Sequence, residues 1–168
     1  MLTLSEHTRT RSDELLALLA PLLAGEDVGL MSDAGCPGVA DPGAELVRLA
    51  HRHGITVVPL VGPSALLLAL MGSGLNGQRF AFHGYLPVNA NERIEALKKL
   101  ENRSRNSDES ELFIETPYRN GAMFQALLTA CRDTTQLCIA CGPPVSVKLL
   151  LPPRQSRGIS LIGLNYWP

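Results

Sequence analysis

The chain has 168 residues, of which 45% are hydrophobic and 18% charged, so it can bury the core of one ordinary domain or of two small ones. Its formal net charge of −1 gives no overall positive field of the kind found in many nucleic-acid-binding proteins, although a local patch would suffice for RNA. The apolar runs are too short to cross a membrane and the N-terminus lacks the pattern of a signal peptide, so we expect a soluble cytoplasmic protein.

The first part of the chain alternates helical and extended patterns. Apolar residues recur at helical spacing in three segments, and two short runs between them are continuously apolar, as in buried parallel strands. The expected elements, in chain order, are a helix from Ser12 to about Gly25, a strand over 28–31, a helix over 45–52, a strand over 55–60 and a helix over 65–71 that Ser64 caps. This alternation predicts an α/β fold with a parallel, Rossmann-like sheet.

Gly, Ser and Asn fill five of the six positions in the run Gly72-Ser73-Gly74-Leu75-Asn76-Gly77, which predicts a loop and a domain boundary. We therefore expect an N-terminal α/β domain over residues 1–76 and a smaller C-terminal α/β domain over 77–141. The expected elements of the second domain are strands at 80–85, 112–115 and 136–141 and helices at 89–105 and 122–131. Prolines interrupt any periodicity in residues 142–168, for which we expect an atypical, irregular tail with one strand at most.

The loop over residues 31–43 holds three glycines, two prolines and two aspartates, which favours a preorganised binding rim. It and the loop over 61–65 both follow expected parallel strands, so both open at the same edge of the sheet. Asp33 can accept from a ribose hydroxyl or pair with a cation, and the hydroxyls of Ser32 and Ser64 add polar contacts. The alternative is that Asp33 and Asp41 only cap turns. Neither a P-loop nor a GxGxxG fingerprint is present.

Other polar residues have weaker functional interpretations. Cys36 as a nucleophile lacks an activating histidine nearby in sequence, so a packing role is favoured. The trio of Glu115, Tyr118 and Arg119 follows a strand and fits either a substrate edge or a surface salt bridge. The cationic run Lys98, Lys99, Arg103 and Arg105 alternates with glutamates, which favours a solvated helix face over an RNA track. One CxxC, Cys138 to Cys141, stands without a second cysteine or histidine pair, so we expect no metal site.

Four motifs resemble those of one family, in the same order and at compatible spacing. Residues 32–43, SDAGCPGVADPG, resemble the "SDAGTPxxSDPG" loop of the RsmI-like branch of the tetrapyrrole-methylase family. Residues 58–65, VPLVGPSA, resemble its "VVPLPGPSA". Residues 82–87, FHGYLP, resemble its "FxGFLP", and residues 113–119, FIETPYR, its "FxESPHR". The resemblance covers about residues 4–141.

The resemblance implies an S-adenosylmethionine-dependent methyltransferase with two α/β domains, the cofactor in the cleft between them, and usually a homodimer. It also implies methylation of a ribose 2′-hydroxyl in small-subunit ribosomal RNA, while other relatives methylate tetrapyrrole carbons. Carried over by motif, the cofactor contacts are Ser32, Asp33, Ala34, Gly35, Cys36, Pro37, Ser64 and Ala65, and the residues facing the acceptor are Glu115, Tyr118 and Arg119. No catalytic base is identified.

The chain departs from the family pattern at both ends. The family normally has a strand and a glycine-rich turn upstream of a segment like residues 5–9, and continues after Cys141 with "DLTLPTE", where this chain has Gly142-Pro143-Pro144. We therefore expect an incomplete sheet with an edge open to a partner chain. Two alternatives stay open: a non-catalytic cofactor-binding or structural homologue, and a methyltransferase acting on a tetrapyrrole or another small acceptor. A hydrolase using Cys36 or Ser64 is disfavoured because no base is evident.

Overall fold

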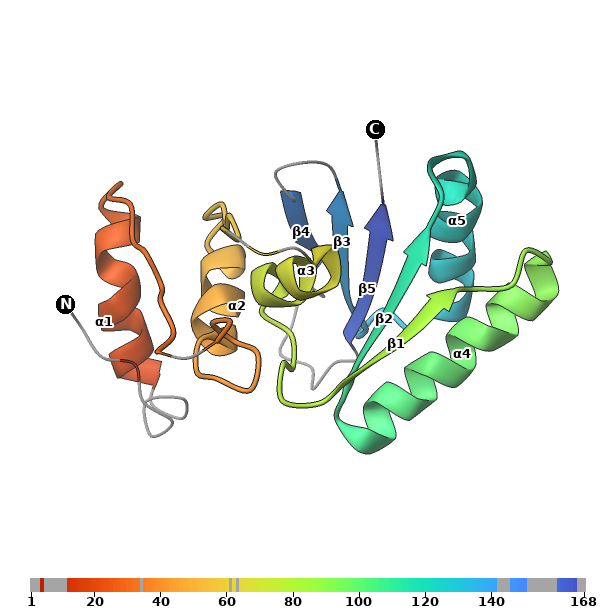
Figure 1. Cartoon of the computed structure of the whole chain (residues 1–168), viewed down its shortest axis with the longest axis horizontal. Helices are drawn as coiled ribbons and strands as arrows, with labels where there is room; N and C mark the ends of the chain where they lie inside the picture. Colours follow the sequence, from red (N-terminus) through yellow and green to blue (C-terminus); the bar gives the residue numbers. More distant parts are fainter. Residues whose placement is uncertain are drawn as a thin grey trace.

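The structure, a computed structural model, describes residues 4, 12–33, 35–60, 62, 64–141, 146–150 and 160–165, and for Ser12 and residues 141–165 the backbone alone. A five-stranded sheet lies in the second half of the chain, in the order β1-β2-β5-β3-β4 (Figure 1). Its strands are β1 (Phe80–Tyr85), β2 (Ser110–Glu115), β3 (Gln136–Cys141), β4 (Ser146–Leu150) and β5 (Ser160–Asn165). All neighbouring strands are parallel except β3 and β4. The expected α/β class is confirmed, but the largely parallel sheet lies over residues 80–165 and not in the N-terminal part, where the sequence predicts it.

Helices cover both faces of this sheet. The helices of the described residues are α1 (Ser12–Leu23), α2 (Ala44–Arg52), α3 (Ala65–Ser73), α4 (Ala90–Ser107) and α5 (Asn120–Ala130), with a short 3-10 helix, η2 (Pro117–Arg119), before α5. Helix α3 packs on one face and α4 with α5 on the other, while α2 and then α1 extend to the side (Figure 1). The result is a three-layer α/β/α arrangement with α1 and α2 attached beside it.

The alternation of side chains along β2 explains the two layers of core. Leu112 points toward α3, where it packs with Ala69, Leu70 and Cys138. Phe113 points to the opposite face, into a cluster that α4 and α5 complete. Because successive strand residues face opposite sides, a strand covered on both faces has to be apolar at successive positions. The run Leu112-Phe113-Ile114 meets that requirement.

The expected strands over 28–31 and 55–60 are wrong as strands: both segments are extended but have no ladder partner among the described residues. A helix layer covers one side of the second segment, because Ile55 and Val57 pack against the cluster formed by α1 and α2. Other apolar side chains of the two segments are exposed: Met31 in the first segment at 81%, and Leu60 in the second at 72%. An apolar sequence favours a strand, but only backbone hydrogen bonds to a neighbour make one. The expected N-terminal sheet is therefore not formed within the described part of the chain.

The expectation of an irregular tail is also wrong for much of residues 142–168. Two strands form there, and β5 lies between β2 and β3, hydrogen-bonded to both. Ser160 pairs with Ser110 on one side and with Gln136 on the other. Six residues suffice for this strand, and so short an apolar run is ambiguous without its neighbours. The tail thus supplies the central strand of the sheet.

Candidate functional site

The glycine-rich loop before α2 is a compact turn structure held by its own backbone. Val39 N donates to Cys36 O at 3.0 Å, and Gly38 N donates to Pro42 O at 3.2 Å. Gly43 precedes α2 with a φ of 138°, and a Cβ there would lie 2.9 Å from Leu30 Cδ2. Only glycine adopts this conformation without strain, so the residue is required where the loop enters the helix.

The predicted cofactor contacts lie in the loop that precedes α2 and at the start of α3. Ser32, Cys36 and Pro37 are half-buried and Asp33 and Gly35 are exposed, while Ala34 lies outside the described residues. Ser64 and Ala65 are half-buried at the start of α3, and Ser64 Oγ accepts from Leu67 N at 3.5 Å, as expected of a cap. Helices α2 and α3 are joined through the carbonyls of residues 72 and 74. Two helix N-termini, each with a positive dipole end, therefore follow the two loops.

The second predicted group, at the carboxyl end of β2, divides into a buried pair and an exposed ring. Glu115 and Arg119 form an ion pair of 3.1 Å with side chains that are 3% and 15% exposed. Glu115 Oε1 also accepts from Thr116 N at 2.8 Å, and Arg119 Nη2 donates to Leu86 O at 3.1 Å. Tyr118, between them in η2, is 85% exposed. Glu115 and Arg119 thus fasten η2 to the end of β1, and Tyr118 points away from the core.

A small recess adjoins this ion pair and was not expected from the sequence. It measures about 40 Å³ and is lined by Phe113, Glu115, Asn120, Met123, Phe124, Leu127 and Ile139. Among the described residues at this recess, Glu115 Oε2 has no polar contact other than its 3.1 Å ion pair with Arg119, and Asn120 Oδ1 has no hydrogen-bond partner. A volume of this size suits one or a few water molecules rather than a nucleoside. No motif marks it, because its lining comes from two strands and a helix.

Comparison with curated proteins connects these features to known sequences; no family model matches the chain. The chain is 36% identical over 137 residues to ribosomal RNA small subunit methyltransferase I of Synechocystis, covering 82% of this chain and 48% of that protein. Its identity to the protein of the same name from Mesorhizobium japonicum is 42% over 129 residues (74% and 42% covered), and to that from Escherichia coli O157:H7 40% over 113 residues (67% and 38%). Over the aligned part, the chain is similar to proteins named ribosomal RNA small subunit methyltransferase I.

The chain spans less than half the length of these curated relatives. This similarity agrees with the four motifs and with their order along the chain. The individual roles of Ser32 to Pro37, Ser64, Ala65, Glu115, Tyr118 and Arg119 stay predictions.

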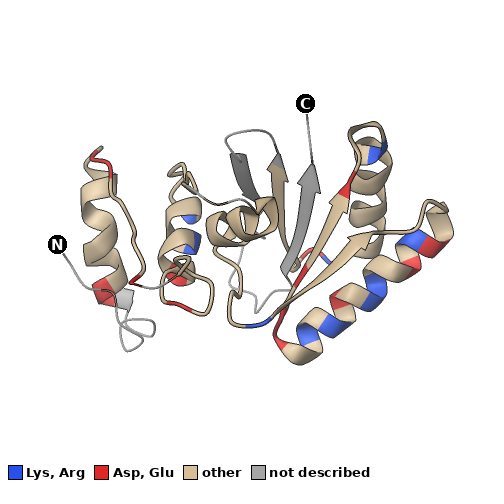
Figure 2. Cartoon of the chain, in the orientation of Figure 1, with Lys and Arg blue, Asp and Glu red and all other residues tan. Residues whose placement is uncertain are grey.

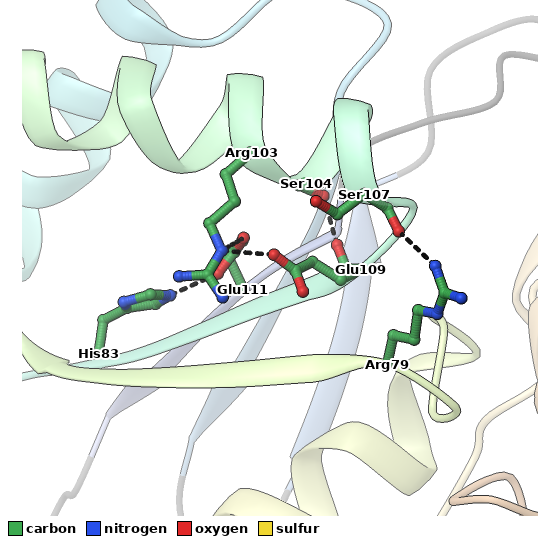
Figure 3. Close-up of polar contacts among 7 residues, drawn as sticks. All are labelled: Arg79, His83, Arg103, Ser104, Ser107, Glu109 and Glu111. Carbon is green, nitrogen blue, oxygen red and sulfur yellow. Dashed lines mark hydrogen bonds and ion pairs between the residues drawn. The ribbon is translucent and has the colours of Figure 1, made fainter.

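A cluster of charged residues lies between α4 and the sheet (Figure 3). Glu111, fully buried on β2, contacts His83 Nε2 of β1 and lies 3.4 Å from Arg103 Nε of α4. The same Arg103 Nε donates to Glu109 at 2.5 Å. The sequence predicts a solvated face of α4, and Lys98 lies there, paired with Glu95 at 3.0 Å, as does Arg103, whose side chain is 51% exposed. Figure 2 shows acidic and basic residues interspersed along α4. Arg103 also joins α4 to β2 through Glu111.

The two glutamates of this cluster have opposite pKa shifts. Burial raises the pKa of Glu111, against the lowering effect of its contact with His83. The hydrogen bond from Arg103 lowers the pKa of Glu109. A carboxyl whose folded-state pKa is raised stabilises the fold below its unfolded pKa, and that contribution is lost as pH rises through the folded pKa. A carboxyl with a lowered pKa stabilises the fold above its unfolded pKa and loses this contribution as pH falls.

We therefore expect Glu111→Gln and Glu109→Gln to change the pH dependence of stability in opposite directions. As pH rises above about 4.3, the usual glutamate pKa, the stability of the wild type relative to Glu111→Gln should fall. As pH drops below about 4.3, the stability of the wild type relative to Glu109→Gln should fall. Urea denaturation from about pH 3 to about pH 8 measures both differences, because this range spans the usual glutamate pKa. Slopes of the same sign would contradict the assignment.

Two further classes of site have no support in the described part of the chain. Among residues whose side chains are described, no group of three or more His, Cys, Asp or Glu is placed to hold a metal ion. No helix within the described ranges is long and apolar enough to cross a membrane. The thiol of Cys138 is buried in β3, and burial raises its pKa to about 12.

Proposed function

We propose that the chain is an S-adenosylmethionine-dependent methyltransferase whose acceptor is a ribose 2′-hydroxyl in small-subunit ribosomal RNA. The observation that carries the proposal is its identity of 33–42% to proteins named ribosomal RNA small subunit methyltransferase I. Such an acceptor would place the protein with the ribosome in the cytoplasm. A homodimer, as the resemblance implies, belongs to the same proposal.

The chemistry of the two loops suits this cofactor. The loop before α2 offers the exposed carboxylate of Asp33 and the hydroxyl of Ser32, and the start of α3 offers the hydroxyl of Ser64. Such groups complement ribose hydroxyls and the cationic amino-acid part of the cofactor. Backbone amides at the exposed Gly35 are open to close approach, since a Cβ there would meet only Ser32 Oγ, at 4.0 Å. When bound, the cofactor supplies a methyl carbon activated by a sulfonium.

The contribution of the protein to such a transfer is mainly proximity and orientation, because the attacking oxygen must approach the methyl carbon in line. Ser32 to Pro37 and Ser64-Ala65 would hold the methyl donor. Tyr118 would contact the RNA, since it is exposed and is held in place by the neighbouring Glu115–Arg119 pair. An exposed tyrosine ring is a stacking surface for an unpaired base.

A second candidate function is cofactor binding without turnover. The open apolar side of the segments around Met31 and Leu60 favours it, because these segments directly precede the two cofactor loops. A binding loop that is packed on just one side is less preorganised for its ligand. Transfer of a labelled methyl group from S-adenosylmethionine to small ribosomal subunits lacking the modification separates the two functions: turnover supports the first, and binding alone supports the second.

For the cofactor site, we expect Asp33→Ala to weaken binding of S-adenosylmethionine by roughly tenfold, since a hydrogen bond to a charged group contributes about 1.5–3 kcal/mol. Isothermal titration calorimetry with the cofactor and with S-adenosylhomocysteine measures the change. Asp27→Ala is the matched control, because Asp27 is exposed in the same half of the chain but lies before the loop. Absence of binding to the wild type at millimolar concentrations would contradict the proposed function.

A further inference from the structure

Residues 72–79, which end α3 and connect it to β1 and are called the connector below, are fixed on two sides although their sequence is typical of a linker. Gly72, Ser73, Gly74, Leu75 and Gly77 are buried. On the side of α2, Arg48 Nε donates to Gly74 O at 3.1 Å and His51 Nε2 donates to Gly72 O at 2.7 Å. These two contacts hold the connector against α2, so it is a packed element rather than a tether.

The other side of the connector is tied to the turn before β2. Ser110 Oγ donates to Asn76 O at 2.8 Å, and Asn76 Nδ2 donates to Asp108 O at 2.5 Å. The Asn76 carbonyl oxygen Oδ1 accepts from Gln78 N at 2.9 Å and closes the local turn. The position of the connector is thus set by the sheet and by α2 together.

At Gly77 the connector touches the glycine-rich loop. Ala40 N donates to Gly77 O at 2.9 Å, and a Cβ on Gly77 would lie 1.8 Å from Gly38 O and 2.8 Å from Gly38 C. Ala40 has a φ of 50°, a conformation that costs a non-glycine residue energy and persists only where the surroundings hold it. The bond to Gly77 is a contact of that kind. Gly77 is needed for space, because any side chain would displace the backbone of the loop.

We propose that Gly77 is a positioning residue for the cofactor loop, holding residues 36–43 in their binding conformation from outside the loop. The inference rests on the proposed function and adds to the cofactor site a residue from outside the glycine-rich loop. Gly77 itself touches no ligand: it acts through the backbone of Gly38 and Ala40. The carbonyl of Gly77 fixes the loop, and the absence of a side chain at Gly77 allows the contact.

The test is Gly77→Ala, with binding of S-adenosylhomocysteine measured by calorimetry and stability by thermal unfolding. At a temperature well below its melting temperature, where the variant is folded, we expect its affinity for S-adenosylhomocysteine to fall by roughly tenfold or more. Gly121→Ala is the matched control, because a Cβ on Gly121 would meet nothing within 4 Å. Leu97→Ala in α4 controls for lost stability, since Leu97 is fully buried in the separate cluster under α4 and α5. Both controls should retain wild-type affinity.

Asn76→Ala provides a second, milder variant in case Gly77→Ala does not fold. It removes the side chain that holds the connector to the turn before β2 without adding atoms. We expect a smaller loss of affinity, by roughly threefold, and faster hydrogen exchange of the Ala40 amide. Unchanged affinity in a folded Gly77→Ala or Asn76→Ala variant would overturn the inference. So would a loss of affinity in Leu97→Ala as large as that in Gly77→Ala for the same loss of melting temperature. A wild type that binds no cofactor would contradict the proposed function, while hydrogen exchange at Ala40 would still test the positioning contact.

Discussion

Replacing Phe113 with alanine is expected to lower the free energy of unfolding by about 3–5 kcal/mol. Phe113 is fully buried in β2 and packs in one cluster with Leu97 and Leu100 of α4 and Met123 and Leu127 of α5. The substitution removes the ring that both helices share and leaves a cavity that the rigid sheet can fill only in part. Chemical denaturation with urea, monitored by circular dichroism, measures the loss.

The matched control for this substitution is Phe82→Ala on the adjacent strand. Phe82 pairs with Leu112 in the parallel ladder, but its side chain is 48% exposed at the edge of the sheet. We expect its loss to cost about 1 kcal/mol or less, because little apolar surface is removed from the core. Equal effects of the two substitutions would show that α4 and α5 do not cover this face of the sheet in solution.

Arg119→Ala is expected to destabilise the protein by about 3 kcal/mol, because it removes one partner of a buried ion pair. The Glu115 carboxylate would stay buried with only the donors of Thr116, and the carbonyls of Leu86 and Pro87 would lose the donor that Arg119 Nη2 provides. The substitution disconnects η2 from the segment after β1. Urea denaturation at neutral pH measures the cost.

Tyr118→Ala, next to Arg119, tests the acceptor site separately from the stability of the fold. The side chain of Tyr118 is 85% exposed, so we expect a change in stability within about 0.5 kcal/mol. If Tyr118 stacks on the RNA acceptor, its loss should lower methyl transfer to ribosomal RNA by roughly tenfold or more at unchanged cofactor affinity. A Tyr118→Phe variant should restore transfer. Methyl transfer that survives Tyr118→Ala unchanged would remove Tyr118 from the acceptor site.

The elements of the second half were largely predictable because local pattern and tertiary environment agree there. The strands over 80–85 and 136–141 have the predicted bounds, and Asn89 caps α4 through its side-chain oxygen, at 2.9 Å from Asn91 N. The helix after β2 begins at Asn120, two residues earlier than expected. In each case the residues that start or stop the element lie within it, so a single sequence contains the signal.

The buried polar contacts could not be predicted in the same way, because their partners are distant in sequence. Glu101 resembles any glutamate on a charged helix, yet its Oε1 accepts from Arg132 N at 2.8 Å and from Thr135 Oγ1 at 2.5 Å. Glu111 follows a run of polar residues, yet it is fully buried between His83 and Arg103. Helix α4 brings these groups to the sheet, and its packing rather than its composition decides which of its charges are solvated.

The sequence by itself determined the α/β class and the helices around the sheet, because these depend on local periodicity, and its ordered motifs indicated the resemblance to one family. Only the tertiary structure decided which extended segments become strands. The apolar segments over 28–31 and 55–60 remain without ladder partners, while the short run of β5 forms the centre of the sheet between β2 and β3. The physical reason is that a helix satisfies its backbone within itself, whereas a strand depends on neighbours that local sequence does not specify.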